Sequence, residues 1–99
     1  MNSEFFAEAR EELLEAALYY DAKETGLGTR FRNEVAHVLE RIEADPFLWR
    51  ERRGGWRKVN CPVFPYYVPY IVRKDLILIA AVAHGSRRPG YWLERLRQR

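Results

Sequence analysis

The stretch Leu76–Trp92 reads LILIAAVAHGSRRPGYW and decides the fold of this chain. Its first eight residues, 76–83, are all apolar, which is too short a run for a membrane span and is typical of a strand buried on both faces. We therefore predict a strand over 76–83 in the middle of a sheet. Polar residues follow at once, beginning with His84, and functional loops are often held by the end of such a rigid strand.

Two helices are predicted ahead of this strand. Apolar residues recur at helical spacing from about residue 7 to 23 and again from about 29 to 44. Gly26 and Gly28 separate the two segments, and Asp45-Pro46 ends the second. The two helices are therefore expected to form an antiparallel hairpin.

The remaining segments predict a small sheet. Residues 56–61 alternate like a half-exposed strand, 66–73 form the next strand, and 2–6 leave room for a short first strand. Pro69 cannot donate to a ladder, so an edge or a bulge is expected there. The alternation in 56–61 places Trp56, Lys58 and Asn60 on one face and Arg57, Val59 and Cys61 on the other.

These elements predict a single α+β domain over residues 1–99. Its N-terminal helical hairpin packs on one face of a small twisted, mainly antiparallel β-sheet, and residues 91–99 add a short C-terminal helix. A hydrophobic content of 47% is enough for a packed core despite 31% charged residues.

Composition narrows the possible functions. The lone Cys61 excludes an internal disulfide and is more typical of a small strand residue than of a nucleophile. No Cys/His cluster has the spacing of a zinc site, so we expect neither a metal nor a cofactor. The first residues lack the features of a signal peptide, so a cytoplasmic protein that does not bind a membrane is expected.

Charge is distributed unevenly along the chain. The net charge is only +3, but residues 1–24 contain two basic and seven acidic side chains, whereas 50–99 contain twelve basic and three acidic ones. The second half therefore creates a positive field, and an anionic partner is expected. The glutamates of the first helix are interpreted as solvating its outer face.

The ordered motifs of the second half resemble those of a known family. They are Phe64-Pro65-Tyr66, a second tyrosine at Tyr70, and the pattern His-x-x-Arg-x-Pro-x-Tyr-Trp from His84 to Trp92. The chain resembles the RelE/ParE superfamily of bacterial type II toxins, closest to its ParE-like branch. This resemblance implies the hairpin-on-sheet fold and a role in plasmid stabilization. It also implies a cognate antitoxin whose C-terminal segment wraps the toxin. The expected assembly is a homodimer of the toxin or a toxin–antitoxin hetero-oligomer.

Three functions fit this resemblance. ParE-like toxins arrest growth by inhibiting DNA gyrase without catalysing a reaction, whereas RelE-like toxins are ribosome-dependent mRNA endonucleases. A third alternative is a non-toxic binding domain of the same fold. We favour the ParE-like toxin, because the chain offers few groups for general acid–base catalysis.

The candidate site residues depend on which function holds. For an endonuclease, His84, Arg87 and Tyr91 are the catalytic candidates, with His84 or Tyr91 handling protons. The alternative interpretation is that His84 caps its strand and hydrogen-bonds a loop carbonyl. Binding of the target or of nucleic acid is assigned to five cations: Arg57, Lys58, Arg73, Arg87 and Arg88.

The aromatic residues also have two interpretations. Tyr91 and Trp92 are able to stack on a base, but Trp92 is expected to be core, locking the tail onto the sheet. Tyr66, Tyr67 and Tyr70 are expected to pack within the sheet. A second basic cluster at Arg50, Arg52 and Arg53 is interpreted as a solubilising turn.

Overall fold

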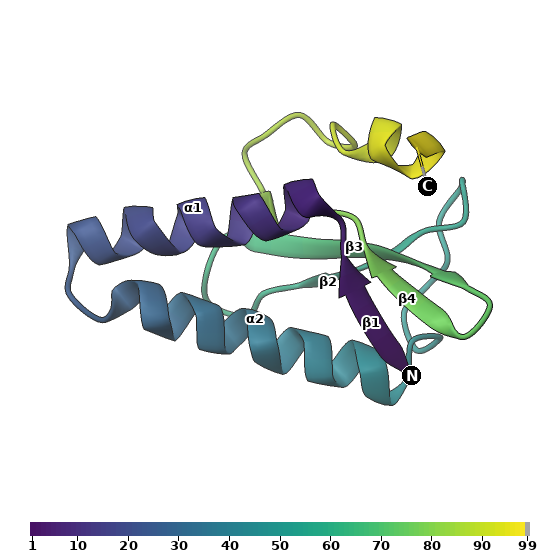
Figure 1. Ribbon diagram of the computed structural model, residues 1–99, viewed down its shortest axis with the longest axis horizontal. Coiled ribbons are helices and arrows are strands. Elements are labelled where there is room, and N and C mark those ends of the chain that lie inside the picture. Colours follow the sequence, from purple (N-terminus) through teal and green to yellow (C-terminus); the bar gives the residue numbers. More distant parts are fainter. Residues whose placement is uncertain (99) are drawn as a thin grey trace.

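The computed structural model describes residues 1–98 and contains a helical hairpin packed on a five-stranded sheet (Figure 1). The helices are α1 (Ala7–Lys23) and α2 (Leu27–Ala44). The strands are β1 (Asn2–Phe5), β2 (Arg57–Asn60), β3 (Tyr66–Arg73), β4 (Leu76–Ile79) and β5 (Ala83–His84), and a 3₁₀ helix, η1 (Leu93–Gln98), follows. The predicted α+β fold is confirmed; Arg99, which the predicted C-terminal helix included, lies outside the described residues.

The strand order is β1-β4-β3-β2, and β5 pairs with β3. β1 runs parallel to β4, with Asn2 opposite Leu76, and all the other pairs are antiparallel. β3 is therefore central, while β1 and β2 are the two edges of the sheet. The predicted strand over 2–6 is confirmed as a short edge strand.

The helical hairpin is held together by close backbone packing at Gly28. A Cβ atom at this position would lie 2.2 Å from the carbonyl oxygen of Ala17, and the Gly28 N–H donates to the Asp21 carboxylate at 2.8 Å. Gly28 therefore lies inside α2, and the prediction that it separates the two helices is wrong. Gly26, at φ 89°, makes the turn alone, because side-chain-bearing residues rarely adopt that conformation.

The predicted continuous strand over 76–83 is wrong in one respect, because it is interrupted between β4 and β5. Three residues, 80–82, lie between Ile79 and Ala83, whereas only two residues of β3 lie between their partners Tyr70 and Tyr67. The extra residue makes this a β-bulge. Pro69 belongs to the central strand β3, so the expected position at a sheet edge is wrong. The bulge itself lies on the partner strand, opposite Pro69.

The two faces of the sheet are covered differently. On one face, Phe31, Val35 and Ile42 of α2 pack with Ile77 and Ile79 in the main core. Successive residues of a strand face opposite sides, so β3 turns Tyr67 and Arg73 to the other face. There Trp92 is fully buried against the alanines of the bulge region, and the predicted core role of Trp92 is confirmed.

Candidate functional site

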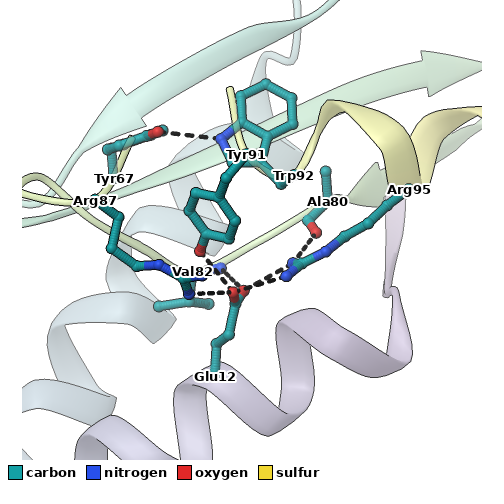
Figure 2. Close-up of polar contacts among 8 residues, drawn as sticks. All are labelled: Glu12, Tyr67, Ala80, Val82, Arg87, Tyr91, Trp92 and Arg95. Atoms are coloured by element: carbon teal, nitrogen blue, oxygen red, sulfur yellow. Dashed lines mark hydrogen bonds and ion pairs between the residues drawn. The ribbon is translucent and has the colours of Figure 1, made fainter. Parts of the chain in front are cut away.

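Glu12 of α1 is the centre of a polar network that holds the C-terminal segment (Figure 2). Its carboxylate accepts a hydrogen bond from the Tyr91 hydroxyl at 2.5 Å and two from the Arg95 guanidinium at 2.9 Å each. It also accepts the Val82 N–H at 3.1 Å, and Arg87 lies 3.6 Å away. The prediction that the α1 glutamates solvate the helix is therefore wrong for Glu12, whose side chain is only 14% exposed.

The missing N–H of Pro69 explains one bond of this network, the one from Arg95 to the Ala80 carbonyl. Pro69 lies opposite Ala80 and accepts the Ala80 N–H at 2.9 Å, so an ordinary residue would return a second bond to the Ala80 carbonyl. Proline has no N–H to give. Arg95 donates to the Ala80 carbonyl instead, at 3.1 Å, and Glu12 accepts the Val82 N–H. The Glu12–Arg95 ion pair therefore satisfies the backbone of the bulge.

Tyr91 is fixed by contacts on both its hydroxyl and its ring. The Arg87 guanidinium lies 3.7 Å from the centre of the ring, a cation–π contact. Burial, reinforced by the hydrogen bond to Glu12, raises the pKa of the Tyr91 phenol above its ordinary value. The hydroxyl proton is thus retained in the bond to Glu12 at neutral pH, which makes Tyr91 a poor general acid.

His84 is engaged with its own loop. Its Nδ1 accepts the Ser86 backbone N–H at 3.0 Å and lies 2.8 Å from the Ser86 hydroxyl. Because Nδ1 is an acceptor, the proton of the neutral ring is assigned to Nε2. The ring packs edge-on against Tyr66, with centroids 5.0 Å apart. His84 is thus engaged with its loop, as the alternative interpretation expected, but its Nδ1 accepts a backbone N–H and the expected bond to a loop carbonyl is not what holds it.

The three catalytic candidates nevertheless share one hollow. His84, Arg87 and Tyr91 line a cavity of about 210 Å³ together with Glu12 and Tyr19 of α1. The three residues are therefore close together in space, and their catalytic role stays a prediction. Their mutual contacts hold them in place, and the Arg87 side chain, at 55% exposed, is the most accessible cation of the Glu12 network.

A larger groove lies on the sheet face that the helices leave free. Its volume is about 660 Å³, and its walls come from β2, β3 and the loop after β5. The cations lining it are Arg52, Lys58 and Arg87. The Lys58 ammonium lies 4.7 Å from the centre of the Tyr67 ring, and Trp56 packs edge-on against Trp92. The groove thus combines positive charge with aromatic walls.

The five predicted binding cations do not form one cluster. Lys58 and Arg87 share the groove, whereas Arg57 lies on the opposite face of β2, where its Nε donates to the Trp49 carbonyl at 2.9 Å. Arg73 lies at the far end of β3 and donates to the Leu96 carbonyl at 3.3 Å. Arg88 is exposed in the loop after β5, where its carbonyl accepts the Tyr91 N–H.

The described residues were also compared with the requirements of a cysteine nucleophile, a metal site and a membrane span. Burial raises the pKa of the Cys61 thiol to about 12, so the thiolate is scarce at neutral pH, as predicted for a structural cysteine. Within residues 1–98, no three acidic, histidine or cysteine side chains come together as a possible metal site. Neither helix in this range has the length and apolar character needed to cross a membrane.

Sequence reasoning missed Glu12, Arg95 and the groove residue Trp56. A signal for Glu12 was present, because it lies three residues after Ala9 and four before Ala16, within the buried stripe of α1. An acidic residue inside an apolar stripe needs a partner. Its partner, Arg95, lies 83 residues further along the chain, so no local sequence pattern connects the two.

Comparison with known proteins now places the chain in a family. A family model described as the ParE toxin of the type II toxin-antitoxin system, parDE, matches residues 4–89. The chain belongs to the ParE toxin family. This confirms the resemblance read from the Phe64-to-Trp92 motifs and makes the chain a toxin of the type II toxin–antitoxin class.

The ParE fold is supported by a solved structure as well. The structure described as the chromosomal ParDE TA system from P. aeruginosa matches with a TM-score of 0.65 and 17% sequence identity, over 85% of this chain and 95% of that one. At this identity the likeness shows a shared fold. No curated protein sequence matches significantly.

Proposed function

We propose that this ParE-family chain arrests bacterial growth by binding DNA gyrase and inhibiting it, without catalysing a reaction itself. A cognate antitoxin, encoded with it, neutralises this activity in a toxin–antitoxin complex in the cytoplasm. The observation that carries the proposal is the state of the proton-handling groups. The Tyr91 hydroxyl donates its hydrogen bond to Glu12, and the His84 Nδ1 accepts one from the Ser86 N–H. An endonuclease needs an acid and a base that exchange protons with its substrate.

A supercoiling assay tests the gyrase proposal. Purified chain is added to gyrase and relaxed plasmid, beside a Tyr91→Phe variant that keeps the ring stacked under Arg87 and removes only the hydroxyl. We expect both proteins to inhibit supercoiling equally per folded molecule. Supercoiling that continues at an excess of folded toxin would refute gyrase as the target.

The groove gives a specific reason to test the RelE-like alternative. Lys58 and Arg87 line the same aromatic groove, an arrangement suited to a phosphate and a stacked base. Expression in cells without antitoxin separates the two functions. Growth arrest with DNA-damage signalling and intact mRNA supports the gyrase proposal. Codon-spaced mRNA cuts that disappear in Tyr91→Phe or His84→Gln would make the chain an endonuclease, and normal growth would indicate a non-toxic binding domain.

A further inference from the structure

The turn after α2, residues 45–49, is held firmly to the sheet. The Pro46 carbonyl accepts a hydrogen bond from the buried Tyr70 hydroxyl at 2.7 Å, and the Trp49 carbonyl accepts one from the Arg57 Nε at 2.9 Å. Both donors belong to strands, Arg57 to β2 and Tyr70 to β3. The turn is therefore preorganised, and the fold fixes which side chains it presents to solvent.

This turn exposes two large apolar side chains. Phe47 is 58% exposed and Leu48 is 64% exposed. The Arg57 guanidinium lies 5.2 Å from the centre of the Phe47 ring, and the Arg41 guanidinium lies 5.3 Å from the centre of the Trp49 ring. Arginines beside accessible aromatic rings are the side chains on which nucleic-acid bases stack.

A basic hollow on α2 continues this surface. Its volume is about 350 Å³, and Arg30, His37 and Arg41 line it together with Pro62. The three α2 residues are seven and four positions apart, so they lie within about 40° of one another around the helix axis. Because Arg41 also contacts the Trp49 ring, the hollow and the turn form one surface.

The cations of the hollow are available to a ligand. Within residues 1–98, neither Arg30 nor Arg41 forms an ion pair. Glu34, an acidic residue that also lines the hollow, is engaged elsewhere, because its Oε2 accepts the Val63 N–H at 3.1 Å and the Phe64 N–H at 2.9 Å. The hollow therefore offers two unpaired guanidinium groups on the side of α2 that borders the turn.

We propose that Arg30, His37 and Arg41 of α2, together with the exposed ring of Phe47, form a binding surface for single-stranded DNA. The two guanidinium groups contact phosphates, and a base stacks on Phe47. Arg30 and Arg41 are separated by about 16 Å along the helix axis, which about five stacked nucleotides span at about 3.4 Å each. Only the choice of DNA over RNA rests on the proposed function, since gyrase acts on DNA.

The backbone of this surface favours a nucleic acid over a peptide. The N–H and C=O groups of a helix bond to one another, and the Pro46 and Trp49 carbonyls of the turn are engaged as well. An added peptide strand would find no free edge here, so recognition relies on charge and on the ring. A second copy of this chain, related by a two-fold axis, would bring Arg30 and Arg41 of both copies together.

Salt dependence tests the phosphate contacts. The full chain is titrated into a fluorescent oligothymidylate of about ten nucleotides, and anisotropy measures the affinity at several salt concentrations. We expect Arg30→Gln and Arg41→Gln each to reduce the slope of log affinity against log salt by about 0.7. Arg32→Gln removes the same charge from the opposite side of α2 and should leave the slope unchanged. An equal reduction by Arg32→Gln would overturn the proposal.

Substitutions at Phe47 test the stacked base. Phe47→Leu keeps an apolar side chain and removes the ring, so we expect it to weaken oligothymidylate binding about tenfold. Phe47→Tyr keeps the ring and should stay within about twofold of wild type. Phe47 is exposed, so neither change opens a cavity in the core. Equal affinities of the two variants would overturn the stacking role.

The same titration distinguishes the competing ligands. Displacement of the oligothymidylate by poly-glutamate at equal charge would show attraction by charge alone and overturn the proposal. A greater loss in Lys58→Ala and Arg87→Ala than in Arg30→Gln would place the strand in the groove and also overturn it. Tighter binding of an oligouridylate would overturn the assignment to DNA.

The outcomes for this surface and for the gyrase proposal are separate. A folded chain that fails to bind oligothymidylate at low salt would overturn this inference, whether or not it inhibits supercoiling. Binding with the expected loss in Arg30→Gln, by a chain that leaves gyrase active, would support this inference and refute only the gyrase proposal.

Discussion

At the residue scale, Glu12 is the side chain that holds the C-terminal segment and the bulge to α1. Its carboxylate satisfies a guanidinium, a phenol and a backbone N–H at once, so its loss leaves several groups without a partner. We expect Glu12→Ala to lower the free energy of unfolding by about 3 kcal/mol. Urea denaturation measures this. Glu11→Ala, at the exposed neighbouring position, is the control and should stay within about 0.5 kcal/mol of wild type; an equal loss in both variants would argue against the network.

Tyr91 predicts how stability depends on pH. Burial and the bond to Glu12 raise its pKa in the folded state above the unfolded value of about 10. The folded protein therefore retains a proton that the unfolded chain loses, and this contribution is complete below about pH 10 and is lost above it. Burial raises the pKa of Tyr66 and of Tyr70 to about 12, which acts in the same direction.

The expected result is a free energy of unfolding that falls steeply above about pH 10. Tyr91→Phe should make this fall shallower, because the variant has one fewer raised tyrosine. Urea unfolding at a series of alkaline pH values measures the slope, and phenolate absorbance reports the ionisation itself. The same slope in Tyr91→Phe and wild type would show that Tyr91 titrates normally in the folded protein.

At the scale of elements, the bulge between β4 and β5 links Pro69 to Arg95. Arg95 bonds the Ala80 carbonyl because Pro69 offers no N–H. Pro69→Ala supplies that N–H, so Arg95→Ala should cost about 1 kcal/mol less in the Pro69→Ala background than in wild type. A double-mutant cycle from urea denaturation measures the difference. Strictly additive effects would mean that the ladder bond does not form when Pro69 is replaced.

The same elements show what the sequence alone predicts. Helical spacing predicted both helices, and alternation placed Lys58 and Arg57 on opposite faces of β2, because these patterns depend on near neighbours. An edge or a bulge was expected at Pro69, but the bulge lies on the partner strand. Its backbone is satisfied by Glu12 and Arg95, which come from distant segments that no local pattern connects. The five predicted binding cations do not gather at one place, because Arg57 lies on the opposite face of β2 from Lys58 and Arg73 lies at the far end of β3.

At the scale of the whole molecule, charge is separated between the N-terminal and C-terminal parts of the chain. Residues 50–99 carry twelve basic and three acidic side chains, and Arg52, Lys58 and Arg87 of this half line the groove on the free sheet face. Such a field speeds the approach of an acidic partner more than it slows its departure. The salt dependence of antitoxin binding should therefore appear mainly in the association rate.

The final prediction follows from that field. We expect the association rate constant with the antitoxin to fall at least about tenfold between about 50 mM and about 500 mM salt, with a smaller change in the dissociation rate. Stopped-flow fluorescence measures both. The double variant Arg52→Gln/Arg87→Gln should weaken the salt dependence, whereas Arg30→Gln/Arg32→Gln on α2 removes the same charge outside the groove and should weaken it less. Equal effects of the two pairs would mean that net charge, and not the position of the groove cations, governs the encounter.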